Sequence, residues 1–295
     1  MIIVKLMGGI GNQMFQYSFA RQLSLKHGVE LKFDISELNS KLINEKSFIR
    51  DFELDNFNIN GETASENERI GFQMNKLGKL VNLIFLYLPF NLNKLYIREP
   101  FFHFFKKALS APENAYLDGY WQTEKYFDGI RNELLKDFTL KMELSEKSKA
   151  IANKLLKQQA VSIHVRKGDY LSMEENKSLF AVCDADYYSA ALNEISKKVK
   201  EPVFYVFSDE PDWFRKNIVT SYSVDFVTHN TGSNSYQDLY LMSLCKHNII
   251  ANSSFSWWGA WLNKNSEKIV IAPKHWFKNN IKDTRDLIPG NWIQL

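Results

Sequence analysis

The sequence predicts an α/β protein with two Rossmann-like halves, because short apolar strands alternate with helical segments along the chain. A strand, a glycine-rich turn and a helix open the chain, and regular strand–helix alternations follow residue 160. Such alternation is typical of parallel, doubly wound sheets. At 295 residues, with 45% hydrophobic and 24% charged residues, the chain is long enough to fill two such cores.

The first half is most regular at its beginning. Gly28 follows a helical pattern and suits a helix C-cap. The stretch from Ile35 to Phe105 is polar, rich in Asn and irregular in period, so we assign no elements to it. The strands expected in this half are Ile2 to Leu6, Val29 to Asp34 and Tyr116 to Trp121, with a helix from about Gln13 to His27.

A charged segment with helical spacing, Asp137 to Gln159, separates the halves, and Ser145 is positioned to cap its helix. We place the domain boundary there, which gives domains 1–145 and 146–295. The strands expected in the second half are Val161 to Val165, Val203 to Ser208, Val224 to Thr228, Asn248 to Ala251 and Lys268 to Ala272. Its expected helices are Asp186 to Lys200, Pro211 to Asn217, Tyr236 to Cys245 and Ser256 to Leu262.

Charge and cysteine content exclude several classes of protein. The net charge of +3 is too small for a nucleic-acid-binding protein but suits an anionic small ligand. Cys183 and Cys245 form no C-x-x-C pair, so we expect reduced, buried thiols and no metal cluster. The chain opens on a strand without a basic and apolar leader, which favours a cytoplasmic protein.

The most apolar stretch, Val81 to Phe90, is too short to span a bilayer and is predicted to be a core or interdomain helix. The alternative is peripheral contact with the inner face of a membrane through this stretch and the neighbouring lysines. These are Lys76, Lys79 and Lys94.

A dense polar cluster ends the first strand of the second half. His164, Arg166, Lys167 and Asp169 follow a run of apolar residues. A buried parallel strand delivers such side chains to the carboxyl edge of a sheet, where open α/β sheets bind ligands. Because a guanidinium grips phosphate oxygens through two parallel hydrogen bonds, we interpret Arg166 as a phosphate ligand. The alternative is a strand end whose charges only reach water.

The turn Gly8-Gly9-Ile10-Gly11-Asn12-Gln13 lies between a strand and a helix, where it favours close backbone approach to a ligand or an anion. Three interpretations are open. Asp34 stands where a ribose-binding acid would in a dinucleotide site, but Met14 replaces the third glycine. Asn12 and Gln13 suit sugar hydroxyls or a phosphate. The turn could also be structural, with a capping Asn.

Two further strand ends carry polar residues. Asp209 follows one strand, and the turn Asn252-Ser253-Ser254-Phe255-Ser256 follows another. Hydroxyls and backbone N–H groups at a helix start form an anion site. The alternative is that these serines only cap the helix.

Together these segments resemble the α1,2-fucosyltransferases of glycosyltransferase family GT11. The resemblance lies in the opening Gly turn, the His164-to-Tyr170 motif, Phe207-Ser208-Asp209 and the Asn252-to-Trp258 turn, in family order over nearly the whole chain. Lys167 departs from the family, which usually has a second Arg at this position. A lysine keeps the charge but loses the fork geometry.

The resemblance implies a GT-B-type fold, with two Rossmann-like lobes and a cleft between them, and GDP-fucose bound in the C-terminal lobe. It implies that Arg166 neutralises the pyrophosphate, that His164 orients it and that Asp238 reads guanine. Asn12 would lie near the reacting sugar. The residues expected to contact the donor are Gly9, Gly11, His164, Arg166, Asp209, Asp238, Ser253, Ser254 and Phe255.

Fucosyl transfer needs compensation for charge on the departing GDP, by a metal or by fixed cations and dipoles. Asp184-Ala185-Asp186 looks like a metal-binding D-x-D, but we interpret Asp186 as the N-cap of a helix and expect no metal. Inversion needs a general base or the departing phosphate to accept a proton. Asp169 is a base or an orienter of Arg166 and Lys167; the weaker candidates for the base are Glu174, Asp34 and Glu124.

Aromatic residues carry less information. Trp257, Trp258 and Trp261 have helical spacing and are expected in the core, whereas Tyr120 and Trp121 are candidates for the acceptor side.

The function predicted is metal-independent, inverting transfer of L-fucose from GDP-fucose to the 2-hydroxyl of galactose in an oligosaccharide or lipid-linked glycan. The alternatives are another linkage or acceptor, or a non-catalytic protein that binds GDP or glycan.

Overall fold

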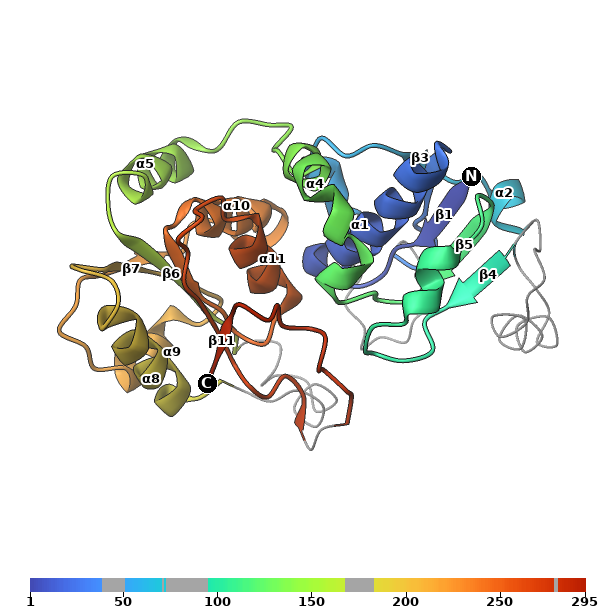
Figure 1. Ribbon diagram of the computed structural model, residues 1–295. Coiled ribbons are helices and arrows are strands. Elements are labelled where there is room, and N and C mark those ends of the chain that lie inside the picture. Colours follow the sequence, from blue (N-terminus) through green and yellow to red (C-terminus); the bar gives the residue numbers. More distant parts are fainter. Residues whose placement is uncertain (39–50, 71, 73–94, 168–182, 279–280) are drawn as a thin grey trace, which may run out of the picture. The chain divides into compact units, whose positions relative to one another are not determined.

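The computed structural model describes residues 1–38, 51–70, 72, 95–167, 183–278 and 281–295, which form two compact units (Figure 1). Unit 1 comprises Met1–Lys141 with Asp283–Leu287, and unit 2 comprises Met142–Lys282 with Ile288–Leu295. The segment Asp283–Leu287 therefore packs with unit 1, although it belongs to the sequence range 146–295. The roles expected of the two lobes, acceptor side and donor side, stay predictions.

Unit 1 is built on a parallel sheet with the strand order β3-β2-β1-β5-β4. Its strands are β1 (Ile2–Lys5), β2 (Leu31–Asp34), β3 (Glu62–Thr63), β4 (Leu95–Arg98) and β5 (Ala115–Asp118). β3 and β4 lie in the irregular stretch to which the sequence pattern assigned no elements. The order reverses between β1 and β5, so this pair is the topological switch point of unit 1.

Helix α1 (Ile10–His27) follows β1 and buries Met14, Phe15 and Phe19 completely. Gly28 ends it in the left-handed conformation with φ of 64°, as expected of a C-cap glycine. The helix begins three residues before the expected start at Gln13. The other helical elements of unit 1 are η1 (Glu53–Asn56), α2 (Glu66–Ile70), η2 (Lys106–Ser110), η3 (Glu124–Tyr126), η4 (Asp128–Ile130) and α4 (Arg131–Asp137).

Unit 2 contains a second parallel sheet, in the order β11-β10-β9-β6-β7-β8. Its strands are β6 (Ala160–Val165), β7 (Val203–Ser208), β8 (Val224–Val227), β9 (His247–Ile249), β10 (Val270–Ala272) and β11 (Ile293–Gln294). Followed along the chain, this is the 3-2-1-4-5-6 order of a Rossmann sheet, with β6 and β9 at the switch point. The five expected strands are confirmed; β11 was not expected.

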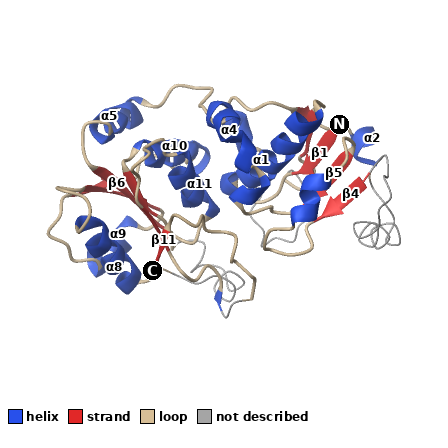
Figure 2. Cartoon of the chain, in the orientation of Figure 1, coloured by secondary structure: helices blue, strands red, loops and turns tan. Residues whose placement is uncertain are grey.

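Helices cover both faces of this sheet, α8 and α9 on one side and α10 and α11 on the other (Figures 1 and 2). They are α5 (Glu146–Leu155), α8 (Ala185–Ser196), α9 (Pro211–Asn217), η5 (Gly232–Asn234), α10 (Tyr236–Leu244) and α11 (Ser254–Leu262). Ser145 caps α5, as expected, by accepting a hydrogen bond from the Ser148 N–H. Helix α11 begins at Ser254 rather than at Ser256.

The N-cap expected at Asp186 is wrong. Asp184 caps α8 instead, because its side chain accepts a hydrogen bond from the Tyr187 N–H at 2.9 Å. Asp186 lies in the first turn of the helix, where a carboxylate also favours the positive helix end.

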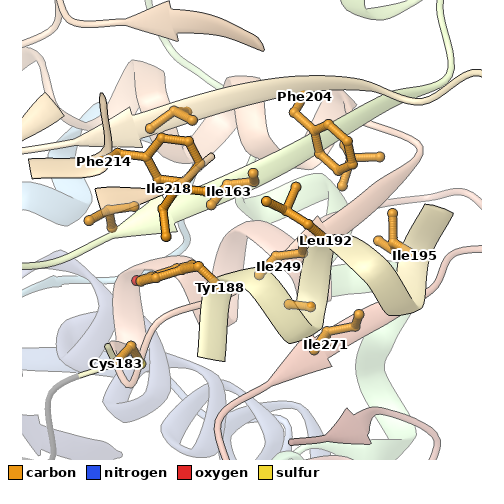
Figure 3. Packing of buried hydrophobic residues seen from close by; sticks show 14 of the residues in the cluster. Ile163, Cys183, Tyr188, Leu192, Ile195, Phe204, Phe214, Ile218, Ile249 and Ile271 are labelled. Atoms are coloured by element: carbon orange, nitrogen blue, oxygen red, sulfur yellow. The ribbon is translucent and has the colours of Figure 1, made fainter. Parts of the chain in front are cut away.

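The core of unit 2 packs α8 and α9 on the sheet. Tyr188, Leu192 and Ile195 of α8 contact strand residues such as Ile163 and Ile249 (Figure 3). Fully burying one large apolar side chain stabilises a fold by about 1.5–3 kcal/mol, so this cluster holds the strands in register. On α11, Trp257, Trp258 and Trp261 are at most 3% exposed, which confirms them as core residues.

Among the described residues, no helix is both long and apolar enough to cross a bilayer. The apolar stretch Val81 to Phe90 and the lysines at 76, 79 and 94 lie outside the described residues. Cys183 and Cys245 are buried free thiols, as expected.

Candidate functional site

The carboxyl edge of the unit 2 sheet gathers most of the expected donor-binding residues. β6 pairs with β9 up to Ile163 and Ile249, so the chain leaves these two strands side by side. His164 and Arg166 lie at the end of β6, and Ser253 follows the end of β9. The helices that follow β8 and β9, α10 and α11, also begin at this edge because the strands are parallel.

His164 is 5% exposed, and its Nδ1 atom is buried without a hydrogen-bond partner among the described residues. Burial, assisted by the positive charge of Arg166, lowers the pKa of His164 to about 3, so the imidazole is neutral near pH 7. The ring lies 5.5 Å from that of Phe255 at the start of α11. An unpartnered buried nitrogen of this kind is destabilising unless a ligand supplies the missing hydrogen bond.

Arg166 is held from β7. Its Nε lies 3.7 Å from Oδ2 of Asp209, and Oδ1 of Asp209 accepts a hydrogen bond from the Lys167 N–H at 3.1 Å. The side chains of Arg166 and Asp209 are both close to 30% exposed. Asp209 therefore helps to orient the guanidinium, and part of the Arg166 side chain stays exposed to solvent.

Lys167 does not contribute a second phosphate-binding charge. It is 4% exposed, its Nζ donates to the Cys183 carbonyl at 2.6 Å, and it lies 3.8 Å from the centre of the Trp213 ring. Burial lowers the pKa of this ammonium group. The charge of Lys167 is directed into the interior of unit 2, so Arg166 is the cation of the two that stays accessible.

The start of α11 carries unused donors. Ser253 is the N-cap residue, yet its hydroxyl makes no capping hydrogen bond. The N–H groups of Ser254 and Phe255 have no hydrogen-bond partner among the described residues. Ser256, by contrast, donates to the carbonyls of Ala251 and Ser253. The interpretation of these serines as simple caps is therefore wrong for Ser253.

Asp238 lies in the first turn of α10. One carboxylate oxygen, Oδ1, accepts a hydrogen bond from Asn230 at 2.7 Å. Burial raises the pKa of Asp238 to about 7, and the single bond from Asn230 only partly opposes this shift. Asn230 also bonds with Ser148 on α5, so α5 and α10 hold the carboxylate together. Oδ2 has no hydrogen-bond partner among the described residues.

The Gly turn of unit 1 is not an anion site. Oε2 of Glu53 accepts a hydrogen bond from the Ile10 N–H at 2.8 Å, so a carboxylate of the protein itself occupies the start of α1. Gln13 is fully buried and bridges Gly8, Asp51 and Glu53. This overturns the dinucleotide interpretation of the turn and removes Gln13 as a ligand.

Asn12 remains the candidate ligand residue of this turn. Its Oδ1 accepts a hydrogen bond from Gln122 Nε2 at 2.7 Å, across the switch point between β1 and β5. Gly9 is the N-cap residue of α1 and Gly11 is buried within it. Gly8 needs the absence of a side chain, because its φ is +75° and a Cβ there would collide with Asn12 Nδ2.

Two other candidates of unit 1, Trp121 and Asp34, are buried within the unit. Trp121 is fully buried, so it offers no sugar platform, whereas its half-buried neighbour Tyr120 stays a candidate for the acceptor side. Asp34 is 3% exposed and accepts hydrogen bonds from Tyr116 and Ser36. Burial would raise the pKa of Asp34, but these bonds outweigh it and hold the pKa below its usual value, which makes Asp34 a weak base.

Asp169 and Glu174 lie outside the described residues, as do Gly168 and Tyr170 of the same motif. Within the described part of the chain, no three His, Cys, Asp or Glu side chains are grouped as a metal site.

Sequence reasoning missed Asn230, Glu53 and Gln122. Asn230 follows a strand end, which was a usable signal. Glu53 and Gln122 act on residues 43 and 110 positions away, and no local pattern marks such contacts.

Comparison with known proteins places these observations in a family. The family model described as Glycosyl transferase family 11 matches residues 1–295. An α1,2-colitosyltransferase from Escherichia coli is 30% identical over 300 residues, covering 100% of this chain and 98% of that protein. The O-antigen biosynthesis glycosyltransferase WbnK, also from Escherichia coli, is 33% identical over 311 residues and covers 98% and 99%.

Among solved structures, a GDP complex of an Arabidopsis thaliana FUT1 mutant aligns with a TM-score of 0.52 and 10% sequence identity. The match covers 91% of this chain and 69% of that one. At this identity the likeness concerns the fold, and it agrees with the GT-B-type pair of Rossmann-like units expected from the sequence.

Gly8→Ala should lower the free energy of unfolding more than Gly28→Ala, as measured by urea denaturation. Both glycines have positive φ, where a Cβ costs about 1–2 kcal/mol. Only at Gly8 would the new methyl group also displace Asn12, because nothing lies within 4 Å of a Cβ at Gly28. Equal losses for the two variants would contradict the close approach of Asn12 to Gly8.

Proposed function

The chain belongs to glycosyl transferase family 11, as its motifs predicted, and we propose that it transfers L-fucose from GDP-fucose to the 2-hydroxyl of a galactose residue. The observation that carries the proposal is the set of donors at the β6–β9 switch point. The accessible guanidinium of Arg166, the unused N–H groups of α11 and the unpartnered His164 Nδ1 belong to one sheet edge of the described chain. These groups suit a diphosphate.

The chemistry needs positive charge where the leaving GDP gains negative charge. The start of a helix carries about half a unit of positive charge, and Arg166 adds a full one. Such fixed donors stabilise a transition state without reorganising. We therefore propose transfer without a metal ion, with Arg166 and the start of α11 in the role that a divalent cation would otherwise take.

His164 orients rather than neutralises the diphosphate. Its imidazole is neutral near pH 7, because burial holds its pKa at about 3. A neutral ring can donate one hydrogen bond and accept another, which suits a phosphate oxygen on one side. The Tyr188 hydroxyl donates to the His164 carbonyl at 2.9 Å and ties this strand end to the core.

Asp238 is proposed to read guanine. A carboxylate accepts hydrogen bonds from the N1–H and N2 amino groups of guanine, and Oδ2 of Asp238 is available for this. Because burial raises the pKa of Asp238 to about 7, GDP should bind the ionised form and displace a proton below that pH.

Inversion follows if the acceptor hydroxyl attacks directly opposite the leaving phosphate. Asp169 stays the first candidate for its base, with the orientation of Arg166 and Lys167 as the alternative role, and Glu174 is the second candidate. Asp34 is a poor base because its pKa is lowered. Glu124, the first residue of η3, stays a weaker candidate.

A second donor has a specific observation behind it. A full-length relative is named α1,2-colitosyltransferase, so the sugar moved by this chain could be colitose with the same linkage. The acceptor proposed is a galactose-containing oligosaccharide or lipid-linked glycan, in line with the O-antigen role in the name of the second relative. The cytoplasmic location and the peripheral membrane contact stay predictions.

Arg166→Ala should lower kcat by about a hundredfold to a thousandfold, the effect of removing one transition-state donor. Arg166→Lys keeps the positive charge but not the two parallel donors of the guanidinium, so its kcat should fall by less. The matched control is Arg215→Ala, an exposed arginine on α9 of the same unit. Normal turnover in Arg166→Ala would remove the phosphate role.

Asp238→Asn should weaken GDP binding and reduce the preference for GDP over IDP, which lacks the N2 amino group. The same variant should be more stable than the wild type at pH 8. A carboxyl whose pKa rises on folding stabilises the fold while protonated, and this contribution is lost as pH rises through about 7. Asn is uncharged like the protonated acid. The stability of the variant relative to the wild type should therefore shrink as the pH is lowered toward 5.

Scanning calorimetry at pH 5 and pH 8 measures the stability of the variant, and titration calorimetry at the same pH values measures its affinity for GDP. Asp128→Asn, at an exposed position of unit 1, makes the same change in net charge and should show neither effect. A variant that binds GDP as tightly as the wild type would exclude Asp238 from the guanine site.

The function itself is tested by incubating the protein with GDP-fucose or GDP-colitose and a panel of galactose-ended acceptors. NMR then determines the linkage and anomeric configuration of the product. We expect an α1,2 product, unchanged by EDTA. Loss of turnover restored by manganese would contradict metal independence. Tight GDP binding without product on any acceptor would favour the non-catalytic binding protein.

A further inference from the structure

Two amide side chains face each other at the switch point of unit 1. Gln122 follows β5 and Asn12 lies in the first turn of α1, after β1. Gln122 Nε2 donates to Asn12 Oδ1 at 2.7 Å, although the residues are 110 positions apart. The bond therefore spans the place where this sheet reverses its strand order, and open α/β sheets bind ligands at that place.

The backbone around Gln122 is held under strain. Trp121, directly before it, has φ of 56°, a value that bulky residues rarely adopt. The Glu99 carboxylate fixes this turn by accepting the N–H groups of Tyr120 at 2.8 Å and Trp121 at 3.0 Å. A Cβ at Gly119 would collide with that of Glu99, so the turn also needs glycine there. Strain of this kind persists where neighbouring groups enforce it, often at functional sites.

The pair leaves one donor and one acceptor unused. Asn12 Nδ2 and Gln122 Oε1 have no hydrogen-bond partner among the described residues. Gln122 is 7% exposed and Asn12 is half-buried. Neither of the two unused amide atoms is fully shielded from solvent. Gln122 Nε2 is a hydrogen-bond donor and needs an acceptor oxygen. The bond therefore sets the orientation of the Asn12 amide, with Oδ1 toward Gln122 and Nδ2 away from it.

The charge around the pair selects the class of ligand. Glu53 already occupies the positive end of α1, so an anion would meet a carboxylate there. A sugar hydroxyl, in contrast, can accept from Asn12 Nδ2 and donate to Gln122 Oε1. We infer that the Asn12–Gln122 amide pair binds hydroxyl groups of the neutral acceptor sugar, and that Gln122 is the positioning residue that turns the Nδ2 group of Asn12 toward it.

The inference rests on the proposed function for the identity of the sugar, but its test is separate. Gln122→Glu replaces the Nε2 donor with an oxygen in a side chain of the same shape. Asn12 must then turn its amide to donate to the introduced carboxylate, and it presents an oxygen where the sugar needs a donor. Binding of methyl β-galactoside in the presence of GDP, measured by titration calorimetry or saturation-transfer NMR, should weaken about tenfold or more. GDP binding, which we propose for unit 2, should stay within twofold.

A pH profile separates this role from a structural one. Lowering the pH protonates the introduced carboxyl group and restores a donor toward Asn12. Galactoside binding by the Gln122→Glu variant should therefore recover toward pH 5, while that of the wild type changes little. Burial favours this recovery because it raises the pKa of a carboxyl group. Gln158→Glu is the matched control, since this half-buried glutamine of unit 2 accepts from Tyr205 and precedes the amino end of β6, the end opposite the polar sheet edge.

Asn12→Asp is the second variant, in case Gln122→Glu lowers Tm. It keeps the bond from Gln122 but replaces the unused donor with a charged carboxylate oxygen, which can only accept, and it should lose at least the same affinity. Galactoside binding that is normal in both variants, or absent in the wild type, overturns the inference. A wild type that binds galactoside but transfers no sugar refutes the proposed function and leaves the amide pair standing.

Discussion

The pairing of β6 with β9 is the constraint on which the donor site depends. These strands are separated in sequence by β7, β8 and the helices between them, yet their carboxyl ends lie next to each other. Their adjacency brings His164 and Arg166 to the edge where α11 starts. Asp209 enters the same edge from β7, on the other side of β6. The phosphate-binding character proposed for this edge thus depends on strand order rather than on any single motif.

The site is also recognisable by what its residues leave unsatisfied. Buried polar atoms in native proteins are nearly always hydrogen-bonded, so the His164 Nδ1 atom and the open start of α11 are exceptions that a ligand would remove. The start of α1 in unit 1 is the opposite case, because Glu53 satisfies it from within the chain. Two helix starts that the sequence marks as possible anion sites therefore differ: the start of α11 keeps unused donors, and the start of α1 is filled by a carboxylate of the chain.

The sequence predicted the fold class, most strands and the polar residues that meet at the carboxyl edge of the unit 2 sheet, because hydrophobic periodicity and polar strand ends are local properties. It failed where a residue's role depends on a distant contact. Gln13 was predicted to be a ligand residue, but its amide is hydrogen-bonded to the backbone of Asp51 and Glu53. Trp121 was a candidate for the acceptor side because it follows a strand, but it is fully buried against Phe19 and Tyr126. The start of α8 was misplaced because two acids, Asp184 and Asp186, both suit a helix start.

A crystal structure of the complex with GDP would test the central claim most directly. The account predicts phosphate oxygens within hydrogen-bonding distance of the Arg166 guanidinium and of the Ser254 and Phe255 N–H groups, with guanine at Asp238. A nucleotide bound instead at the Gly turn of unit 1, with the edge of β6 and β9 empty, would contradict it.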